Sequence, residues 1–450
     1  MCAILALCHR GAGIITAVTT GSDTGAPNGP RRQPFDRWFR YPAGFGAQAI
    51  AETIGNVPVG LIVDPFAGAA TIGTRVCAAG RSFAGIEAHP EIAHLANLKF
   101  ARDVDTEAIR RAGVEVAGGS DGVGDHEYDL VRRSFDGATL AALVGMRDRI
   151  ESLGGGTCHS ILKWALLASL REVASVRVGW PYQQPGVARS PRMTDARRAF
   201  LRRVGWMLED LESVHDSGDG RVIQGDSRTR AAWVQLLPTG QAAAVISSPP
   251  YLNNFDYADA TRLEAYFWRT VGSWDAMCRV IRSDMITATT QQTRKATAAI
   301  ATEELIAIAP RAAASVEAVV QRLAVEVKLR AHGKEYDRLV PMYFRDIAQV
   351  LQRMSENCVD GASVQLVVGD SAPYGVYIDT PRLIEATAIE LGFDKGEGEL
   401  IRMRGRRWAT NGTRHALLLR EEVVRLRAPH CVTQTQTQTQ TQTQTQTQIG

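Results

Sequence analysis

The stretch GLIVDPFAGAATIGTRVCAAGRSFAGIEAHP, residues 60–90, decides the fold class of this chain. An apolar run from Leu61 to Val63 leads into a turn of small residues, and a helical pattern begins near Thr71. A second apolar run follows and ends on the acid Glu87. Continuous apolar strands that alternate with helices are typical of a parallel sheet covered on both faces. The stretch therefore predicts a β–turn–α–β unit.

The turn DPFAGAATIG, residues 64–73, has the composition of a ligand-binding loop. Glycine lets a backbone approach a ligand closely, and the N-terminus of the following helix offers free N–H groups. Glu87, at the end of the next strand, is placed to accept hydrogen bonds from two ribose hydroxyls. The turn lacks both the GK[ST] of a phosphate loop and a full G-x-G-x-x-G. A cofactor with a ribose but no phosphate, such as S-adenosylmethionine, fits best; a ligand-free turn is the alternative.

The rest of the chain predicts one α/β domain with two helical insertions. The strand and helix rhythm is interrupted over residues 101–220 and again over 270–340, and it resumes after each. We expect a catalytic domain over residues 31–430, with the first insertion as the candidate target-recognition part. Residues 1–30 are expected to be a disordered leader. The Thr-Gln repeat within residues 431–450 has no hydrophobic set to bury and is expected to be disordered.

Composition excludes several classes of protein. The chain has 450 residues, 45% of them hydrophobic, and no apolar run long enough for a membrane helix. Its seven cysteines show no CxxC pair and no metal-ligand spacing, so we expect reduced thiols, no metal and a cytoplasmic location. The apolar start, MCAILALCHRGAGIITAV, lacks a basic leading segment, although a signal peptide is the alternative reading.

A second informative stretch is SSPPY, residues 247–251, which ends another apolar run. Proline has no N–H, so the loop presents acceptors, the Ser248 hydroxyl and the Pro249 carbonyl. Tyr251 adds a flat ring on which a base could stack. The set suits a planar group with an exocyclic amine; a plain Ser-Pro-Pro turn is the alternative. In GDSR, residues 225–228, Asp226 could accept from an adenine amine, although such turns are common.

In this order, DPFAG, the acid of IEAHP, GDSR and SSPPY resemble the DNA amino-methyltransferases of the cytosine-N4/adenine-N6 group. Further pieces of the chain add to the resemblance: FRYPAGFG, YFRDIAQVL, VVGDS and RGRRW. The resemblance covers roughly residues 34–100, 221–268 and 340–425 and leaves out most of both insertions. It implies a Rossmann-like class I methyltransferase fold, with a mostly parallel, doubly wound α/β sheet.

The resemblance also implies roles for individual residues. The cofactor-binding set would be Phe45, Asp64, Phe66, Gly68, Glu87 and Asp226. The catalytic set that holds the target amine would be Ser248, Pro249, Pro250 and Tyr251. In this family a first-position serine favours cytosine N4 over adenine N6. Ala70 departs from the family pattern, which usually has a second glycine there, and this puts cofactor affinity in question.

The implied partner is double-stranded DNA with the target base flipped out, and a separate cognate restriction endonuclease is a further candidate. Alternatives are an adenine-N6 DNA enzyme, an RNA enzyme acting on guanine N2 of tRNA, and a decayed nucleic-acid-binding protein. Methylation of cytosine carbon-5 is disfavoured because the chain has no Pro-Cys pair. Three basic clusters are candidate phosphate contacts: Arg31, Arg32, Arg37 and Arg40; Arg189, Arg192, Arg197, Arg198, Arg202 and Arg203; Arg402, Arg404, Arg406 and Arg407.

Overall fold

The computed structural model describes residues 34–41, 53–179, 183–214, 218–253, 255–293, 295–404 and 417–430. The expected leader and the Thr-Gln tail lie outside these ranges. Within the described ranges, no helix combines the length and the apolar character needed to cross a membrane.

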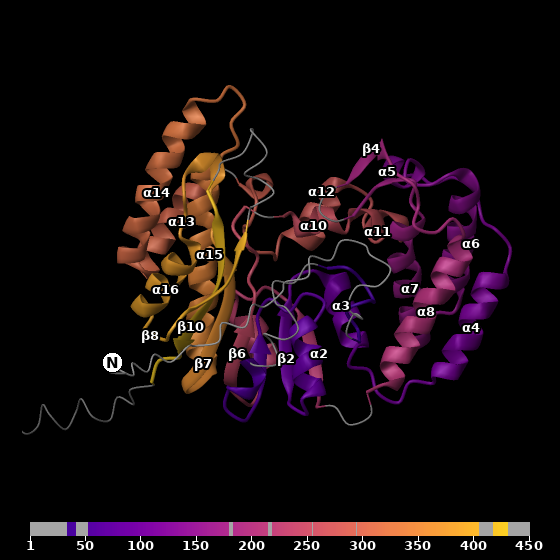
Figure 1. Cartoon of the computed structure of the whole chain (residues 1–450), viewed down its shortest axis with the longest axis horizontal. Helices are drawn as coiled ribbons and strands as arrows, with labels where there is room; N and C mark the ends of the chain where they lie inside the picture. The colour runs from indigo at the N-terminus through magenta and orange to yellow at the C-terminus, as the bar shows by residue number, and fades with distance from the viewer. Residues whose placement is uncertain are drawn as a thin grey trace, which may run out of the picture. The chain divides into compact units, whose positions relative to one another are not determined.

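A single large sheet carries the fold, in the strand order β5-β2-β1-β6-β7-β10-β8, with β9 added alongside β10. Neighbours from β5 to β7 are parallel, and β10 is antiparallel to β7, β8 and β9. Figure 1 shows β2, β6 and β7 in this order across the sheet. The strands are β1 (Ile62–Asp64), β2 (Phe83–Glu87), β5 (Gly220–Gln224), β6 (Ala242–Ser247), β7 (Cys358–Gly369), β8 (Asp394–Lys395), β9 (Glu399–Arg404) and β10 (Leu419–Arg427). The predicted mostly parallel, Rossmann-like sheet is confirmed.

The sheet is buried on both faces because alternate strand residues pack into two different cores. Ile62 of β1 and Val367 of β7 belong to one core, which α2 (Thr71–Ala78) and α3 (Pro90–Leu98) help to cover. Val63 and Leu366 belong to the other. The helices that contribute to this second core are α9 (Arg230–Leu236), α13 (Lys295–Ile308), α14 (Pro310–Lys328), α15 (Tyr336–Asn357) and α16 (Thr380–Glu390). This two-sided burial explains why the strands read as continuous apolar runs.

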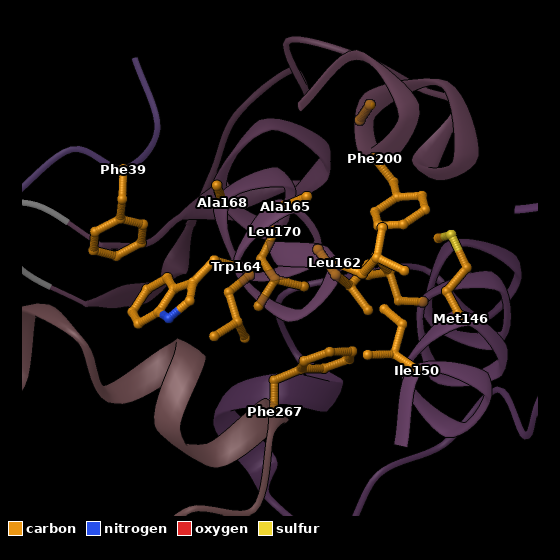
Figure 2. Packing of buried hydrophobic residues seen from close by; sticks show 14 of the residues in the cluster. Phe39, Met146, Ile150, Leu162, Trp164, Ala165, Ala168, Leu170, Phe200 and Phe267 are labelled. Atoms are coloured by element: carbon orange, nitrogen blue, oxygen red, sulfur yellow. The ribbon is translucent and has the colours of Figure 1, made fainter. Parts of the chain in front are cut away.

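The first helical insertion lies between α3 and β5 and has its own core. Its elements are α4 (Thr106–Gly118), α5 (Asp129–Arg132), α6 (Gly137–Ser152), α7 (Thr157–Val173), the β3 (Val176–Arg177) and β4 (Gln184–Ala188) pair, and α8 (Ala196–Glu212). Figure 2 shows Leu162 and Trp164 of α7 among side chains that include Phe200 and Phe267, all of them buried. Complete burial of such side chains contributes about 1.5–3 kcal/mol each. Asp105, Asp136 and Asp195 cap the first turns of α4, α6 and α8.

Two short helices, α10 (Tyr257–Ala260) and α11 (Arg262–Phe267), follow β6 and precede the second insertion, residues 270–340. The shorter elements of the insertion are α12 (Trp274–Met277), the π-helical turn η1 (Cys278–Arg282) and the 3₁₀ turn η2 (Thr290–Gln292), and it returns to the sheet through α15. The helices α13 and α14 then pack on α15, and the last short turn, η3 (Pro373–Gly375), follows β7. A segment without regular structure, residues 283–289, connects η1 to η2 and becomes important at the site.

Candidate functional site

The sequence motifs meet at the carboxyl edge of the parallel strands. β1 ends at Asp64, β2 ends at Glu87 and β6 ends at Ser247. Because β1 pairs with both β2 and β6, the strand order reverses next to β1. In open α/β sheets, ligands bind in the crevice at such a reversal.

A pocket of about 680 Å³, part of which is open to solvent, lies at this edge. The described residues that line it are Tyr41, Pro65, Phe66, Gly68, Ile86, Glu87, Ala88, Ser227, Ser248, Pro250, Phe255, Asp256, Tyr257, Asp284, Met285, Ile286, Ala288 and Gln292. The cofactor-type turn, the acid of β2 and part of the SSPPY loop therefore share one cavity.

Glu87 is the carboxylate of the pocket that lies nearest the turn. Its Oε2 accepts a hydrogen bond from the backbone N–H of Gly68 at 2.8 Å, and its Oε1 accepts from the N–H of His89 at 2.8 Å. Burial raises the pKa of Glu87 to about 7, although these two bonds act in the opposite direction. Each carboxylate oxygen keeps a further lone pair, so the group retains the capacity to accept from two hydroxyls.

Asp64 does not line the pocket; it stabilises the turn through hydrogen bonds behind it. It is buried, and its Oδ1 accepts from Ser247 Oγ at 2.5 Å and from the N–H of Phe66 at 2.9 Å. Burial raises its pKa to about 7. The carboxyl therefore joins the end of β1 to the end of β6, and Phe66 is the residue it presents to the pocket.

The turn itself needs a left-handed backbone at two positions. Gly68 has φ +52, and a Cβ there would lie 3.4 Å from the Tyr41 ring. Ala70 also has positive φ (57) and caps α2 with its methyl group fully buried. A left-handed alanine costs roughly 1–2 kcal/mol. Alanine in place of the family's second glycine therefore costs free energy through the backbone conformation. It does not obstruct the pocket, because Ala70 is not among the residues that line it.

The SSPPY loop enters the pocket through Ser248 and Pro250. The Ser248 hydroxyl donates to the carbonyl of Val367 on β7 at 3.3 Å. With its proton directed there, its lone pairs remain available as acceptors. Pro249, between the two lining residues, is buried.

Tyr251 lies behind the pocket rather than in its lining. Its ring is only 7% exposed, and its hydroxyl donates to Glu421 Oε1 of β10 at 2.9 Å. The Arg404 guanidinium lies 5.0 Å from the ring centroid. A base could stack on this ring only after Arg404 or its neighbours move, so the stacking role stays a prediction.

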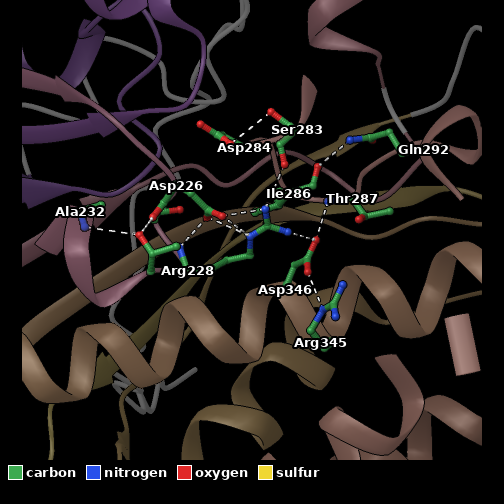
Figure 3. Close-up of polar contacts among 12 residues, drawn as sticks. Asp226, Arg228, Ala232, Ser283, Asp284, Ile286, Thr287, Gln292, Arg345 and Asp346 are labelled. Carbon is green, nitrogen blue, oxygen red and sulfur yellow. Dashed lines mark hydrogen bonds and ion pairs between the residues drawn. The ribbon is translucent and has the colours of Figure 1, made fainter. Parts of the chain in front are cut away.

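Asp226 is likewise outside the lining, although the next residue, Ser227, is part of it. Both carboxylate oxygens of Asp226 face the Arg228 side chain, at 2.8 to 3.1 Å (Figure 3). Its predicted role with the adenine amine is untested. The remaining predicted cofactor residue, Phe45, lies outside the described residues.

Several lining residues were not predicted. Phe255, Asp256 and Tyr257 follow SSPPY closely, and their proximity in the chain was a usable signal. The segment from Asp284 to Gln292 belongs to the second insertion, and nothing in its local pattern indicates a site. The described residues contain no group of histidine, cysteine and acidic side chains arranged to hold a metal ion.

Most of the described basic clusters serve the fold. Arg37 pairs with Asp210, Arg197 pairs with Asp121, and Arg202 and Arg203 both pair with Glu172. Arg189 donates to the carbonyls of residues 171 and 174, Arg402 pairs with Glu421, and Arg404 donates to the carbonyl of residue 370. Arg40 also has an interaction partner.

Arg192 and Arg198 have no ion pair within the described ranges. Both line a surface groove at the start of α8. Arg31, Arg32, Arg406 and Arg407 lie outside the described residues. Arg192 and Arg198 are therefore the members of the second basic cluster that are available to bind a phosphate, and both lie in this groove.

Comparison with known proteins gives no family for this chain. No protein-family model matches it, and no curated protein matches it in sequence. Among solved structures, the rRNA methyltransferase AviRa from Streptomyces viridochromogenes matches with 9% identity and a TM-score of 0.26 over 86% of each chain. A similarity at this level carries no argument about activity, so the function must be argued from the site.

The raised pKa of Glu87 predicts a pH-dependent affinity for ribose. An ionised carboxylate is a stronger acceptor for hydroxyl groups than a protonated one, and with a pKa of about 7 Glu87 is largely protonated at pH 6 and largely ionised at pH 8. The probe 5′-methylthioadenosine contains a ribose and has no group of its own that titrates between pH 6 and pH 8. Its binding should therefore strengthen about tenfold over this range, as measured by calorimetry. In Glu87→Gln the dependence should disappear. An affinity that is flat with pH in the unmodified chain would contradict the expectation.

The same two acids give the sign of the pH effect on stability. The folded-state pKa values of Asp64 and Glu87, about 7, lie above those of unfolded carboxyls near ~4. Between these limits the folded chain holds protons that the unfolded chain releases. The contribution of both groups to the free energy of unfolding is therefore lost as pH rises from about 4 to about 7.

The burial of Tyr251 predicts a cost for removing its hydroxyl alone. Tyr251→Phe keeps the ring and leaves Glu421, which is 1% exposed, without one of its hydrogen bonds. We expect a loss of about 1–3 kcal/mol in the free energy of unfolding, measured by urea denaturation. Cofactor binding should stay near normal, because Tyr251 does not line the pocket. A weakened cofactor affinity without a loss of stability would contradict this placement.

Proposed function

We propose that this chain is an S-adenosylmethionine-dependent methyltransferase that acts on the exocyclic amine of a base flipped out of double-stranded DNA, with cytosine N4 preferred to adenine N6. The observation that carries the proposal is that Gly68, Glu87, Ser248 and Pro250 line one pocket. These residues come from three sequence motifs: Gly68 from DPFAG and Glu87 from IEAHP, which are of the kind that binds an adenosyl ribose, and Ser248 and Pro250 from SSPPY, which is of the kind that accepts from an amine.

The pocket fits the cofactor in chemistry. Glu87 offers carboxylate oxygens for the ribose, and Gly68 leaves room for close backbone approach beside the Tyr41 ring. Ile86, Met285 and Ile286 supply apolar walls for a flat adenine. When bound, this cofactor supplies a methyl group on a positively charged sulfur.

The role of the SSPPY loop in the reaction is to activate and position the amine nitrogen of the base. The amine nitrogen of a base is a weak nucleophile because its lone pair is delocalised into the ring. The Ser248 hydroxyl and the Pro249 carbonyl would accept hydrogen bonds from the amine, which favours a pyramidal nitrogen with an available lone pair. Holding that nitrogen in line with the methyl group supplies the remaining advantage through proximity.

Contacts with nucleic acid are proposed for the groove at the start of α8, through Arg192 and Arg198. Unpaired guanidinium groups suit phosphate oxygens, and such contacts position a duplex without reading its sequence. We assign sequence reading to the first helical insertion, which carries this groove.

The experiment that tests the proposal is transfer of a labelled methyl group to genomic DNA and, in parallel, to total tRNA, followed by mass spectrometry of the nucleosides. Label in N4-methylcytosine supports the proposal in full, and label in N6-methyladenine corrects the base. Label in a methylated guanine of tRNA would replace DNA by RNA as the substrate. Label in neither polymer would favour a protein that binds without turnover.

A further inference from the structure

Residues 283–289 of the second insertion bring a further carboxylate to the pocket, besides Glu87 and Asp256, of which Asp256 is paired with Arg282. Asp284, Met285, Ile286 and Ala288 all line it, next to Ser227 of the GDSR turn. The backbone at Ser283 lies beside this turn, because its carbonyl accepts from Arg228 Nη2 at 3.4 Å. The pocket therefore has acids on two sides, Glu87 on one strand end and Asp284 on the inserted segment.

Asp226, the carboxylate expected to meet an adenine amine, is already fully engaged. Arg228 Nε contacts both of its oxygens, at 2.9 and 3.1 Å, and Nη2 contacts Oδ2 at 2.8 Å. The N–H of Arg228 also donates to Oδ1, at 2.9 Å. A ligand amine would compete with a charged partner that contacts both carboxylate oxygens, and such pairs are among the strongest hydrogen bonds in proteins.

A second buried carboxylate holds the Arg228 side chain in this position. Its Nη1 lies 3.1 Å from Oδ2 of Asp346, a fully buried carboxylate of α15 (Figure 3). Burial lowers the pKa of Arg228, but the charges of Asp346 and Asp226 outweigh it and raise the pKa above its usual value. A shift of Arg228 to free Asp226 would leave Asp346 buried with a partner missing, which is costly.

The same carboxylate fixes the inserted segment. Asp346 Oδ2 accepts from the N–H of Thr287 at 2.7 Å, which holds residues 283–287 against α15. Asp284 projects from this segment, and among the described residues its carboxylate accepts one hydrogen bond, from Ser283 Oγ at 3.2 Å (Figure 3). Its carboxylate thus keeps most of its acceptor capacity and faces a cavity with apolar neighbours on the same segment.

We infer that Asp284, rather than Asp226, accepts the hydrogen bond from the amine of the cofactor's adenine ring. The inference rests on the proposed function, since it takes the ligand of the pocket to be an adenosyl compound. Met285 and Ile286 flank Asp284 in the lining and provide apolar surface for the ring. Asp226 is then a positioning residue that orients Arg228, and the second insertion contributes directly to cofactor specificity.

The test compares two probes that differ only at the amine: S-adenosylhomocysteine and its purine-riboside analogue, in which hydrogen replaces the 6-amine. Calorimetry should give about 10- to 100-fold tighter binding of the adenosyl compound to the unmodified chain, the range for one hydrogen bond to a charged group. In Asp284→Ala most of this preference should disappear, and Asp284→Asn, which keeps a neutral acceptor, should retain a smaller preference of about 2- to 10-fold. Asp275→Asn, an exposed aspartate of α12 paired with Arg279, is the matched control and should keep the preference.

The outcomes separate this inference from the function on which it rests. If Asp284→Ala keeps the preference and Asp226→Asn loses it, the inference is overturned and the proposed cofactor stands. If the unmodified chain binds neither probe, both fail together. Melting temperatures show whether each variant is folded, and Asp284→Ala should melt as the unmodified chain does because its side chain supports no other element.

Discussion

Glu87→Ala is expected to weaken the binding of S-adenosylhomocysteine by about 100-fold or more. Two ribose hydroxyls would lose a charged acceptor, and each such hydrogen bond contributes about 1.5–3 kcal/mol. A tenfold change in affinity corresponds to about 1.4 kcal/mol. Glu87 is the only carboxylate of the described β-strand ends that lines the pocket, so no neighbour on the sheet replaces it. Calorimetric titration measures the loss directly.

Two further variants show whether the loss is specific to ribose binding. Glu87→Gln keeps an oxygen for only one of the two N–H groups, those of Gly68 and His89, and places an NH2 donor opposite the other. It should therefore melt somewhat below the unmodified chain and still bind poorly when folded. Glu317→Ala removes a partly exposed acid of α14 that does not line the pocket, and it should leave affinity unchanged. Near-normal binding by Glu87→Ala would show that the pocket does not hold a ribose at this position.

The fold was predictable because the signals for it are local. The apolar runs, the glycine-containing turn and the acid after the second strand are all within residues 60–90. The structure begins α2 at Thr71 and ends β2 at Glu87, as the pattern predicts. Local patterns suffice here because parallel strands buried on both faces must be apolar throughout.

The site was only partly predictable, because several of its features depend on partners far along the chain. SSPPY identifies acceptors, but the position of Tyr251 depends on Glu421 and Arg404 in the last strands. Likewise, no local pattern shows that the acid of GDSR is engaged by Arg228, itself anchored on α15. Sequence motifs thus indicated which chemistry is present, whereas long-range ion pairs decide which of its groups are free.

Asp346→Ala is expected to lower the free energy of unfolding by about 3–5 kcal/mol, the usual cost of breaking a buried charge pair. The side chain is 0% exposed, and it accepts from Thr287 N–H and contacts Arg228 and Arg345. Its removal leaves two guanidinium groups without their shared partner. Urea denaturation measures the loss, and Asp346→Asn, which keeps an acceptor for Thr287, should lose less.

Asp346→Ala should also weaken cofactor binding, because Asp346 holds the segment that forms one wall of the pocket. Glu172→Ala is the matched control: Glu172 is a buried acid of α7 that pairs with Arg202 and Arg203 and does not line the pocket. It should cost similar stability and leave the affinity for S-adenosylhomocysteine unchanged in the folded protein. If both variants bind alike, the ion pairs at Asp346 stabilise the fold without shaping the site. Asp346 holds residues 283–287 in their place at the pocket. If only Asp346→Ala binds poorly, the second insertion is therefore part of the cofactor site.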